Sequence, residues 1–174
     1  MANKEMEVVK GLDLQRYMGR WYEIASFPSR NQPKDGENTR ATYTLRNDGT
    51  VQVLNETWSN GKRGYIQGTA YKVDPKSDEA KFKVKFYIPP FLPIIPINGD
   101  YWVLFTDDEY QYALIGQPSR NYLWVSKPIC LNFFFKFLIL VFFCCQGFEC
   151  LLTCFVTNPY YKMHLRELLD DINS

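Results

Sequence analysis

The side chains that could do covalent chemistry are few and poorly placed for it. The single histidine, His164, lies in a short amphipathic helical pattern near the end of the chain, and all five cysteines follow residue 126. A Ser–His–Asp or Cys–His arrangement needs a histidine beside its nucleophile, and residues 1–126 contain neither a histidine nor a cysteine. The sequence therefore predicts a protein that is not an enzyme.

Metal and nucleic-acid binding are not indicated either. The acidic run at residues 107–109 is typical of a tight turn, and no further oxygen ligands follow at the spacing of a calcium loop. The last four cysteines, within residues 144–154, lack the paired spacing of a zinc site. The net charge of +1 gives no electrostatic reason to expect a nucleic acid. We expect no metal, no cofactor and no obligate protein partner.

The cysteine distribution and the first residues predict a reducing compartment. Residues 1–126 contain no cysteine and therefore cannot form a disulfide among themselves, which suits a cytoplasmic protein. The opening residues Met-Ala-Asn-Lys-Glu-Met-Glu contain no apolar run, so no signal peptide is expected.

A series of strands and turns runs from residue 19 to residue 125 and must position any site. Asn-Asp-Gly at residues 47–49 and Asn-Gly at 60–61 are hairpin signals. Phe82, Val84 and Phe86 alternate with lysines, which indicates a strand with one dry face. Eight such strands in succession predict an all-β up-and-down barrel or a sandwich. The predicted strands are 19–27, 38–46, 51–58, 64–73, 80–88, 101–106, 110–116 and 122–125.

Three short motifs occur in order within this series. Gly19 and Trp21 begin the segment Gly-Arg-Trp-Tyr-Glu-Ile-Ala, followed by Tyr-Gln-Tyr-Ala-Leu-Ile-Gly at 110–116 and Asn-Tyr-Leu-Trp at 121–124. With these motifs, residues 10–125 resemble the lipocalin family, and within it the plant temperature-induced group related to bacterial lipocalin and apolipoprotein D. The resemblance implies an eight-stranded up-and-down antiparallel barrel in residues 1–125. It also implies that Gly19 and Trp21 close one end of that barrel.

Alternation along the strands, counted from Trp21, predicts the inner lining. Phe27 and Gly68 are expected on the same face as the predicted ligand-binding residues. Aromatic walls with few polar groups favour a small apolar ligand such as a fatty acid, a lysolipid or a sterol. The alternative is that these side chains fill a packed core. The predicted ligand-binding residues are Glu23, Ala25, Ala41, Tyr43, Val53, Ala70, Phe82, Val84, Phe86, Tyr101 and Phe105.

A proline-rich apolar loop follows the clearest strand and carries no charge. Because proline removes backbone donors, we expect this segment to stay outside the sheet and either to pack on the barrel or to contact a membrane. In the resembled group the loop is taken as the membrane contact. The lysines at 81, 83 and 85 could face anionic headgroups, although a solvated face is the simpler interpretation. The predicted membrane-contact residues are Pro89, Pro90, Phe91, Leu92, Pro93, Ile94, Ile95 and Pro96.

The resemblance ends after Trp124, and we treat residues 126–174 as a divergent apolar tail, rich in cysteine and phenylalanine and either helical or disordered. The family places an arginine over Trp21 at position 128, which is proline here, and Lys127 falls on the other strand face. Three interpretations stay open: a transmembrane helix, a folded cap and unselected sequence from a retained intron. We favour the intron, because Val125-Ser126 can be encoded by the splice-donor sequence GTAAGT.

Together these observations predict that the barrel binds one apolar ligand and that the protein associates peripherally with the plasma membrane. The resemblance implies a plant protein that protects membranes during heat, cold, salt or oxidative stress. The alternative is a membrane-associated structural protein, or a poorly folded splice variant, in which the cavity is incidental.

Overall fold

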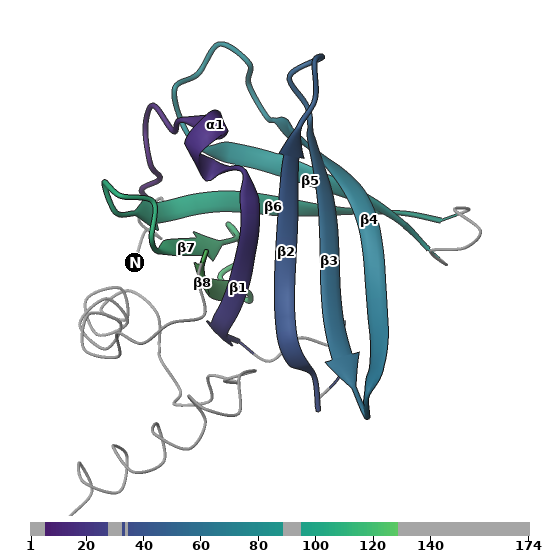
Figure 1. Cartoon of the computed structure of the whole chain (residues 1–174). Helices are drawn as coiled ribbons and strands as arrows, with labels where there is room; N and C mark the ends of the chain where they lie inside the picture. Colours follow the sequence, from purple (N-terminus) through teal and green to yellow (C-terminus); the bar gives the residue numbers. More distant parts are fainter. Residues whose placement is uncertain (1–5, 28–32, 34, 89–94, 129–174) are drawn as a thin grey trace, which may run out of the picture.

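The computed structural model describes residues 6–27, 33, 35–88 and 95–128, which form a closed barrel of antiparallel strands in chain order (Figure 1). Each strand pairs with the next, and β8 returns to pair with β1. The expected eight-stranded up-and-down barrel is therefore confirmed. The strands are β1 (Gly19–Ser26), β2 (Glu37–Leu45), β3 (Val51–Ser59), β4 (Lys62–Lys72), β5 (Lys81–Ile88), β6 (Ile95–Thr106), β7 (Ala113–Gly116) and β8 (Leu123–Lys127).

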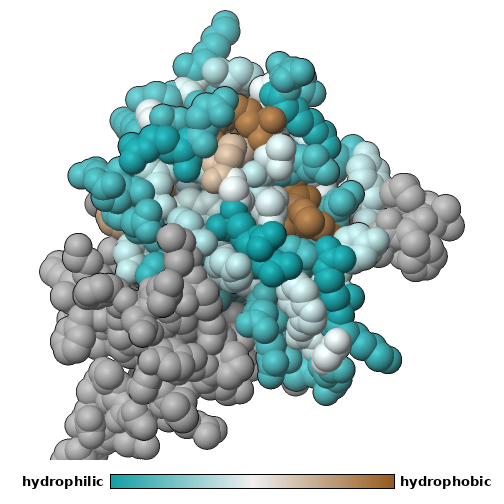
Figure 2. Space-filling model, in the orientation of Figure 1, coloured by the Kyte–Doolittle hydropathy of each residue, from teal (hydrophilic) through white to brown (hydrophobic). Residues whose placement is uncertain are grey.

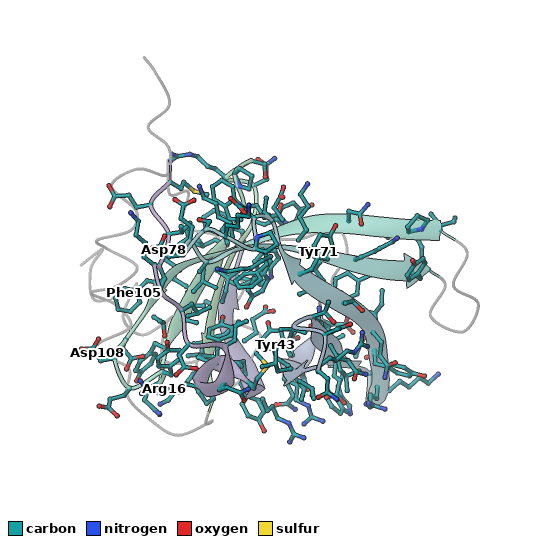
Figure 3. All side chains as sticks on the ribbon, turned by 90° about the horizontal axis from the view of Figure 1, so that it is seen from above. Arg16, Tyr43, Tyr71, Asp78, Phe105 and Asp108 are labelled. Carbon is teal, nitrogen blue, oxygen red and sulfur yellow. The ribbon has the colours of Figure 1, made fainter. Side chains whose placement is uncertain are left out.

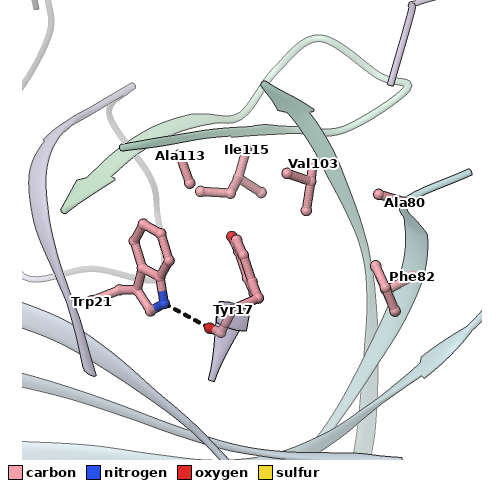
Figure 4. Close-up of a cluster of buried hydrophobic side chains, with 7 residues drawn as sticks. All are labelled: Tyr17, Trp21, Ala80, Phe82, Val103, Ala113 and Ile115. Carbon is pink, nitrogen blue, oxygen red and sulfur yellow. Dashed lines mark hydrogen bonds between the residues drawn. The ribbon is translucent and has the colours of Figure 1, made fainter. Parts of the chain in front are cut away.

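One end of the barrel is closed by the short helix α1 (Leu14–Tyr17) and the start of β1. Asp13 caps the helix by accepting hydrogen bonds from backbone N–H groups of its first turn. Gly19 then turns the chain into β1 with a φ of 103°, a conformation that favours glycine. The Trp21 indole N–H donates to the Tyr17 carbonyl oxygen at 2.9 Å, and the two rings lie 4.8 Å apart (Figure 4). This pair forms the floor of the barrel.

The segment that precedes α1 runs across the closed end and is hydrogen-bonded to the barrel beside the floor. The Val9 N–H donates to the Val103 carbonyl, and the Ala80 N–H donates to the Val9 carbonyl. Side chains of Tyr17, Trp21, Phe82 and others gather above this crossing as one buried cluster (Figure 4). Burial of these side chains therefore ties the N-terminal segment to β1, β5, β6 and β7.

No arginine covers Trp21 at position 128, and the neighbouring lysine does not replace it. Lys127 pairs in register with Tyr22, the residue after Trp21 and so on the opposite face of β1. Its ammonium lies 5.2 Å from the ring of Tyr112. The expectation that Lys127 occupies the other face is confirmed, and Tyr17 is the ring that packs on Trp21.

Two bulges change which side chains face inward. The register shifts between Glu23 and Ala25 in β1, and again between Val103 and Phe105 in β6. Each bulge adds a residue to one strand, so the alternation reverses beyond it. A second buried cluster results on the opposite face of β1, β7 and β8, made of Ile24, Ala25, Leu114, Leu123 and Val125.

Most strand ends differ from the prediction by one or two residues, and the starts of β6 and β7 differ by more. β6 begins at Ile95, six residues early, and pairs with β5 although Pro96 lies within it. Its pairing with β7 starts at Trp102, so among the described strands residues 95–101 of β6 pair with β5 alone. Proline is tolerated on such an edge strand. β7 begins at Ala113 because Asp107 instead binds two backbone N–H groups at residues 111–112. β8 continues to Lys127.

Several sequence predictions fall on residues that the structure does not describe. These are the loop at 89–94, the tail from 129 onward, the five cysteines and His164. The described face in Figure 2 is mainly hydrophilic, with apolar residues separated from one another.

Replacing Trp21 with alanine should lower the free energy of unfolding by about 3–5 kcal/mol, as for a large aromatic removed from a core. Trp21 is only 2% exposed, and both its ring and its N–H have partners. Urea denaturation followed by circular dichroism would measure the change. Tyr71→Ala, which removes an aromatic side chain that is 41% exposed on β4, is the matched control and should have a much smaller effect. Equal losses from both variants would contradict this assignment of the floor.

Candidate functional site

The inner walls are built from rows of side chains set by strand register. Tyr43 pairs with Val53, Val53 with Gly68, and Gly68 with Phe86. The row nearer the floor runs from Leu45 through Val51 and Ala70 to Val84, and the row nearer the mouth contains Ala41, Asn55 and Ile66. Since successive residues of a strand point to opposite faces, these rows share the face of Trp21, which pairs with Ala41.

The walls are apolar, and part of them stays accessible. Val53, Ala70 and Val84 are buried together, while Tyr43 and Phe86 pack against them and are only partly buried. Ala41 is also partly accessible. A fully packed core would bury these positions as completely as their neighbours. The arrangement can therefore present apolar surface to a guest molecule.

Gly68 determines how the Phe86 ring lies. A Cβ added at Gly68 would stand 2.5 Å from Phe86 Cδ1 and 2.6 Å from the Lys85 carbonyl oxygen. A side chain there would push the aromatic ring and the backbone of β5 away from β4. Glycine lets the ring lie flat against the wall.

Three tyrosine hydroxyls form a polar group just above the floor. The Tyr101 hydroxyl lies 2.8 Å from that of Tyr17 and 3.0 Å from that of Tyr43. Burial raises the pKa of Tyr17 and Tyr101 well above the ordinary value, and it raises the pKa of Tyr43 to about 12. At neutral pH all three phenols are therefore protonated and can donate hydrogen bonds.

Glu23 is the one acidic side chain predicted to line the barrel. It is 8% exposed and accepts a hydrogen bond from the Ser26 hydroxyl at 2.7 Å. It pairs with Ser126, which in turn pairs with Ala113 of the floor cluster. Its charge adds to the rise in the Tyr43 pKa, after the larger effect of burial.

Three residues predicted to face inward lie elsewhere, and the prediction for them was wrong. Ala25 pairs with Val125, which pairs with Leu114, which pairs with Phe105. All of these side chains belong to or pack against the cluster on the opposite face from Trp21. Figure 3 accordingly shows Phe105 near the edge of the molecule and Tyr43 near its middle. The cause is the pair of bulges, which a strict alternation from Trp21 cannot anticipate. Phe27 packs on the same outer cluster.

Sequence reasoning also missed several residues of the inner face, among them Tyr17, Val103, Ile115 and Trp124, which belong to or pack on the floor cluster. Tyr17 lies on a helical turn, so strand alternation could not reach it. The N-cap Asp13 was the available signal for that turn. Val103 follows Tyr101 by two residues and could have been found by the same alternation.

The mouth carries an apolar lip on the β5–β6 hairpin, which extends beyond the neighbouring strands (Figure 1). Ile97 pairs with the wall residue Phe86, and Ile95 pairs with Ile88. The two isoleucines are 39% and 56% exposed, respectively. The apolar wall therefore continues outward to the base of the proline-rich loop.

The described part of the chain offers little for other chemistry. It contains neither histidine nor cysteine, and it holds no group of three or more potential metal ligands. Among the described residues no helix is long and apolar enough to span a bilayer.

Comparison with known proteins agrees with this geometry. Residues 12–127 match the family described as Lipocalin-like domain. The chain is 79% identical over 122 residues to temperature-induced lipocalin-1 of Arabidopsis thaliana, covering 70% of this chain and 66% of that protein. It is 40% identical over 121 residues to the outer membrane lipoprotein Blc of Escherichia coli strain K12, covering 68% and 63%. The chain thus spans just under two thirds of the length of these relatives.

A solved structure shares the fold at low identity. Insecticyanin from the tobacco hornworm Manduca sexta superposes with a TM-score of 0.70 at 21% identity, covering 88% of this chain and 84% of that one. This likeness concerns the fold alone.

The raised phenol pKa values predict an alkaline transition in stability. Because these pKa values are higher in the folded than in the unfolded protein, the stabilisation is complete below about pH 10 and is lost as the pH rises towards 12 and beyond. Tyrosinate absorbance should show that Tyr17, Tyr43 and Tyr101 form a buried class that ionises only as the protein unfolds. Tyr43→Phe should reduce the buried class by one. Reversible ionisation of Tyr17, Tyr43 and Tyr101 near pH 10, without unfolding, would contradict the buried hydroxyl group.

Proposed function

The chain belongs to the lipocalin family, and on this premise we propose that its barrel binds one small apolar ligand while the protein associates with a membrane surface. The observation that carries the proposal is a closed barrel with an apolar inner wall, a sealed floor and an apolar lip at the opposite end. Such a barrel can hold a single guest that enters from the mouth.

The wall chemistry supports a lipid-like ligand, such as a fatty acid, a lysolipid or a sterol. Val53, Ala70, Val84 and Phe86 offer aliphatic and aromatic surface with few polar atoms. Transfer of a 16-carbon chain from water would contribute on the order of 10 kcal/mol at about 0.8 kcal/mol per CH₂, before the costs of association and ordering. This is enough to allow useful affinity after those losses.

The membrane contact is assigned to the proline-rich loop and the lip beside it. Ile95 and Ile97 are the described part of this surface and are exposed. Lys85 and Tyr87 lie on the outward face of β5 nearby, with the ammonium 5.1 Å from the ring. Tyrosine and lysine suit the headgroup level of a membrane. A ligand could then pass from the bilayer along the lip into the barrel.

The biological setting is a plant membrane under stress. High identity to a protein named temperature-induced lipocalin-1 supports a role in heat and cold, and we extend it to salt and oxidative challenge. The proposed location is the cytoplasmic side of the plasma membrane, held peripherally rather than by a spanning segment.

Phe86→Arg should reduce the affinity for a fluorescent apolar probe by about tenfold or more, because it places a charge on the apolar wall without a partner. The matched control is Tyr87→Arg, which changes the adjacent residue on the outward face, where the side chain is 38% exposed. Fluorescence titration of both variants would measure the effect. Unchanged binding in a folded Phe86→Arg variant would show that this face does not hold the ligand.

Replacing Phe91, Leu92, Ile94 and Ile95 with serine should lower binding to liposomes by about tenfold or more, since interfacial binding scales with buried apolar area. The barrel should remain folded, because only Ile95 of these four lies in a described strand and it is 56% exposed. Co-sedimentation would measure the bound fraction. Serine at Tyr71 and Val73, which are exposed near the closed end, is the control. Equal co-sedimentation of loop variant and wild type would remove the loop from the membrane contact.

A further inference from the structure

The polar group at the barrel floor has an unused hydrogen-bond donor. Tyr17, Tyr43 and Tyr101 supply three O–H protons, and two hydrogen bonds join the hydroxyls, both of them to Tyr101. Each hydrogen bond uses one proton. Whichever way the protons are arranged, one O–H has no acceptor among the described residues.

This donor lies among apolar side chains. Tyr17 is 3% exposed and lies in the floor cluster with Trp21 and Phe82, while Tyr43 and Tyr101 also pack against the wall cluster of Val53 and Val84. A donor in such surroundings favours any guest that brings an oxygen to it. The hydroxyls therefore mark a polar anchoring point near the floor of the barrel.

The surroundings suit a neutral oxygen better than an anion. Among the residues that the structure describes, no basic side chain lowers the pKa of any of the three phenols, and the Glu23 carboxylate acts on Tyr43. A carboxylate brought to the floor would lose its water without gaining a cation. A hydroxyl or carbonyl oxygen would lose far less on desolvation and could still accept the proton.

We propose that the Tyr17–Tyr101–Tyr43 hydroxyl group binds the neutral oxygen of a ligand that enters polar end first, so that the protein prefers uncharged amphiphiles such as long-chain alcohols, acylglycerols or sterols to fatty-acid anions. This rests on the proposed function, because it assumes that the barrel takes a lipid-like guest. The apolar part of the guest then lies along Val53, Val84 and Phe86, with its far end towards Ile97 at the lip.

The test compares ligands of equal chain length on the full chain at pH 8. Dodecan-1-ol and dodecanoate each displace N-phenyl-1-naphthylamine, an uncharged fluorescent probe. We expect dodecan-1-ol to bind about tenfold more tightly than dodecanoate, a difference of about 1.4 kcal/mol. Dodecanoate binding as tightly as the alcohol, or more tightly, would overturn the proposal without any variant.

The assignment to the three hydroxyls is tested by replacing all three tyrosines with phenylalanine. Removing mutually bonded hydroxyls together keeps the ring shapes and leaves no polar atom orphaned, so the fold should survive. The preference for the alcohol should fall to about twofold or less, while probe affinity is retained. The control variant replaces the exposed residues Tyr65, Tyr71 and Tyr87 with phenylalanine. It should keep the preference for dodecan-1-ol over dodecanoate.

The outcomes separate this inference from the proposed function. If the probe and both ligands bind but without preference, or if the triple phenylalanine variant keeps the preference, the hydroxyl anchor is wrong and apolar binding stands. If neither the probe nor either ligand binds the wild-type protein, the proposed function fails and the anchor fails with it.

Discussion

The packing of Trp21 on Tyr17 is the contact on which the rest of the barrel depends. An indole N–H bonded to the backbone of the preceding helical turn fixes how β1 leaves α1, and the two packed rings close the end of the barrel. The same contact gathers β5, β6 and β7 around one buried cluster. Position 128 is not arginine, and Tyr17 is the ring that packs against the indole. A barrel with an unsealed floor would admit water from both ends and could not hold an apolar guest.

Sequence reasoning predicted the architecture because it depends on short-range signals. Turn residues such as Asn60 and Gly61 end strands locally, and the alternation of Phe82, Val84 and Phe86 specifies which face is dry. These wall residues lie where alternation placed them. Ala25 and Phe105 do not, because a bulge is a property of pairing between two strands and leaves no mark on one strand alone. Pro96 was misjudged for a similar reason, since a free edge tolerates proline and the sequence does not say where an edge is.

The barrel combines two environments that act on different parts of a guest. In the proposed function, aliphatic and aromatic walls would supply most of the binding free energy by removing apolar surface from water, and they would discriminate weakly between chain lengths. The hydroxyls of Tyr17, Tyr43 and Tyr101 lie at one depth, so they can determine which end of the guest enters first. At the other end Ile97 and Ile95 continue the wall to the loop proposed to meet the membrane. The choice of guest, its orientation and its entry would then depend on different levels of one barrel.

A crystal structure of the protein with a bromine-labelled amphiphile tests the central claim most directly, because anomalous scattering locates the bromine without reference to any assumed pose. The account predicts an anomalous peak inside the barrel, between the Trp21 floor and the Phe86 wall or at the lip beside Ile97. A peak confined to the outer surface, with the interior filled by protein side chains, would contradict the conclusion that the barrel is a container.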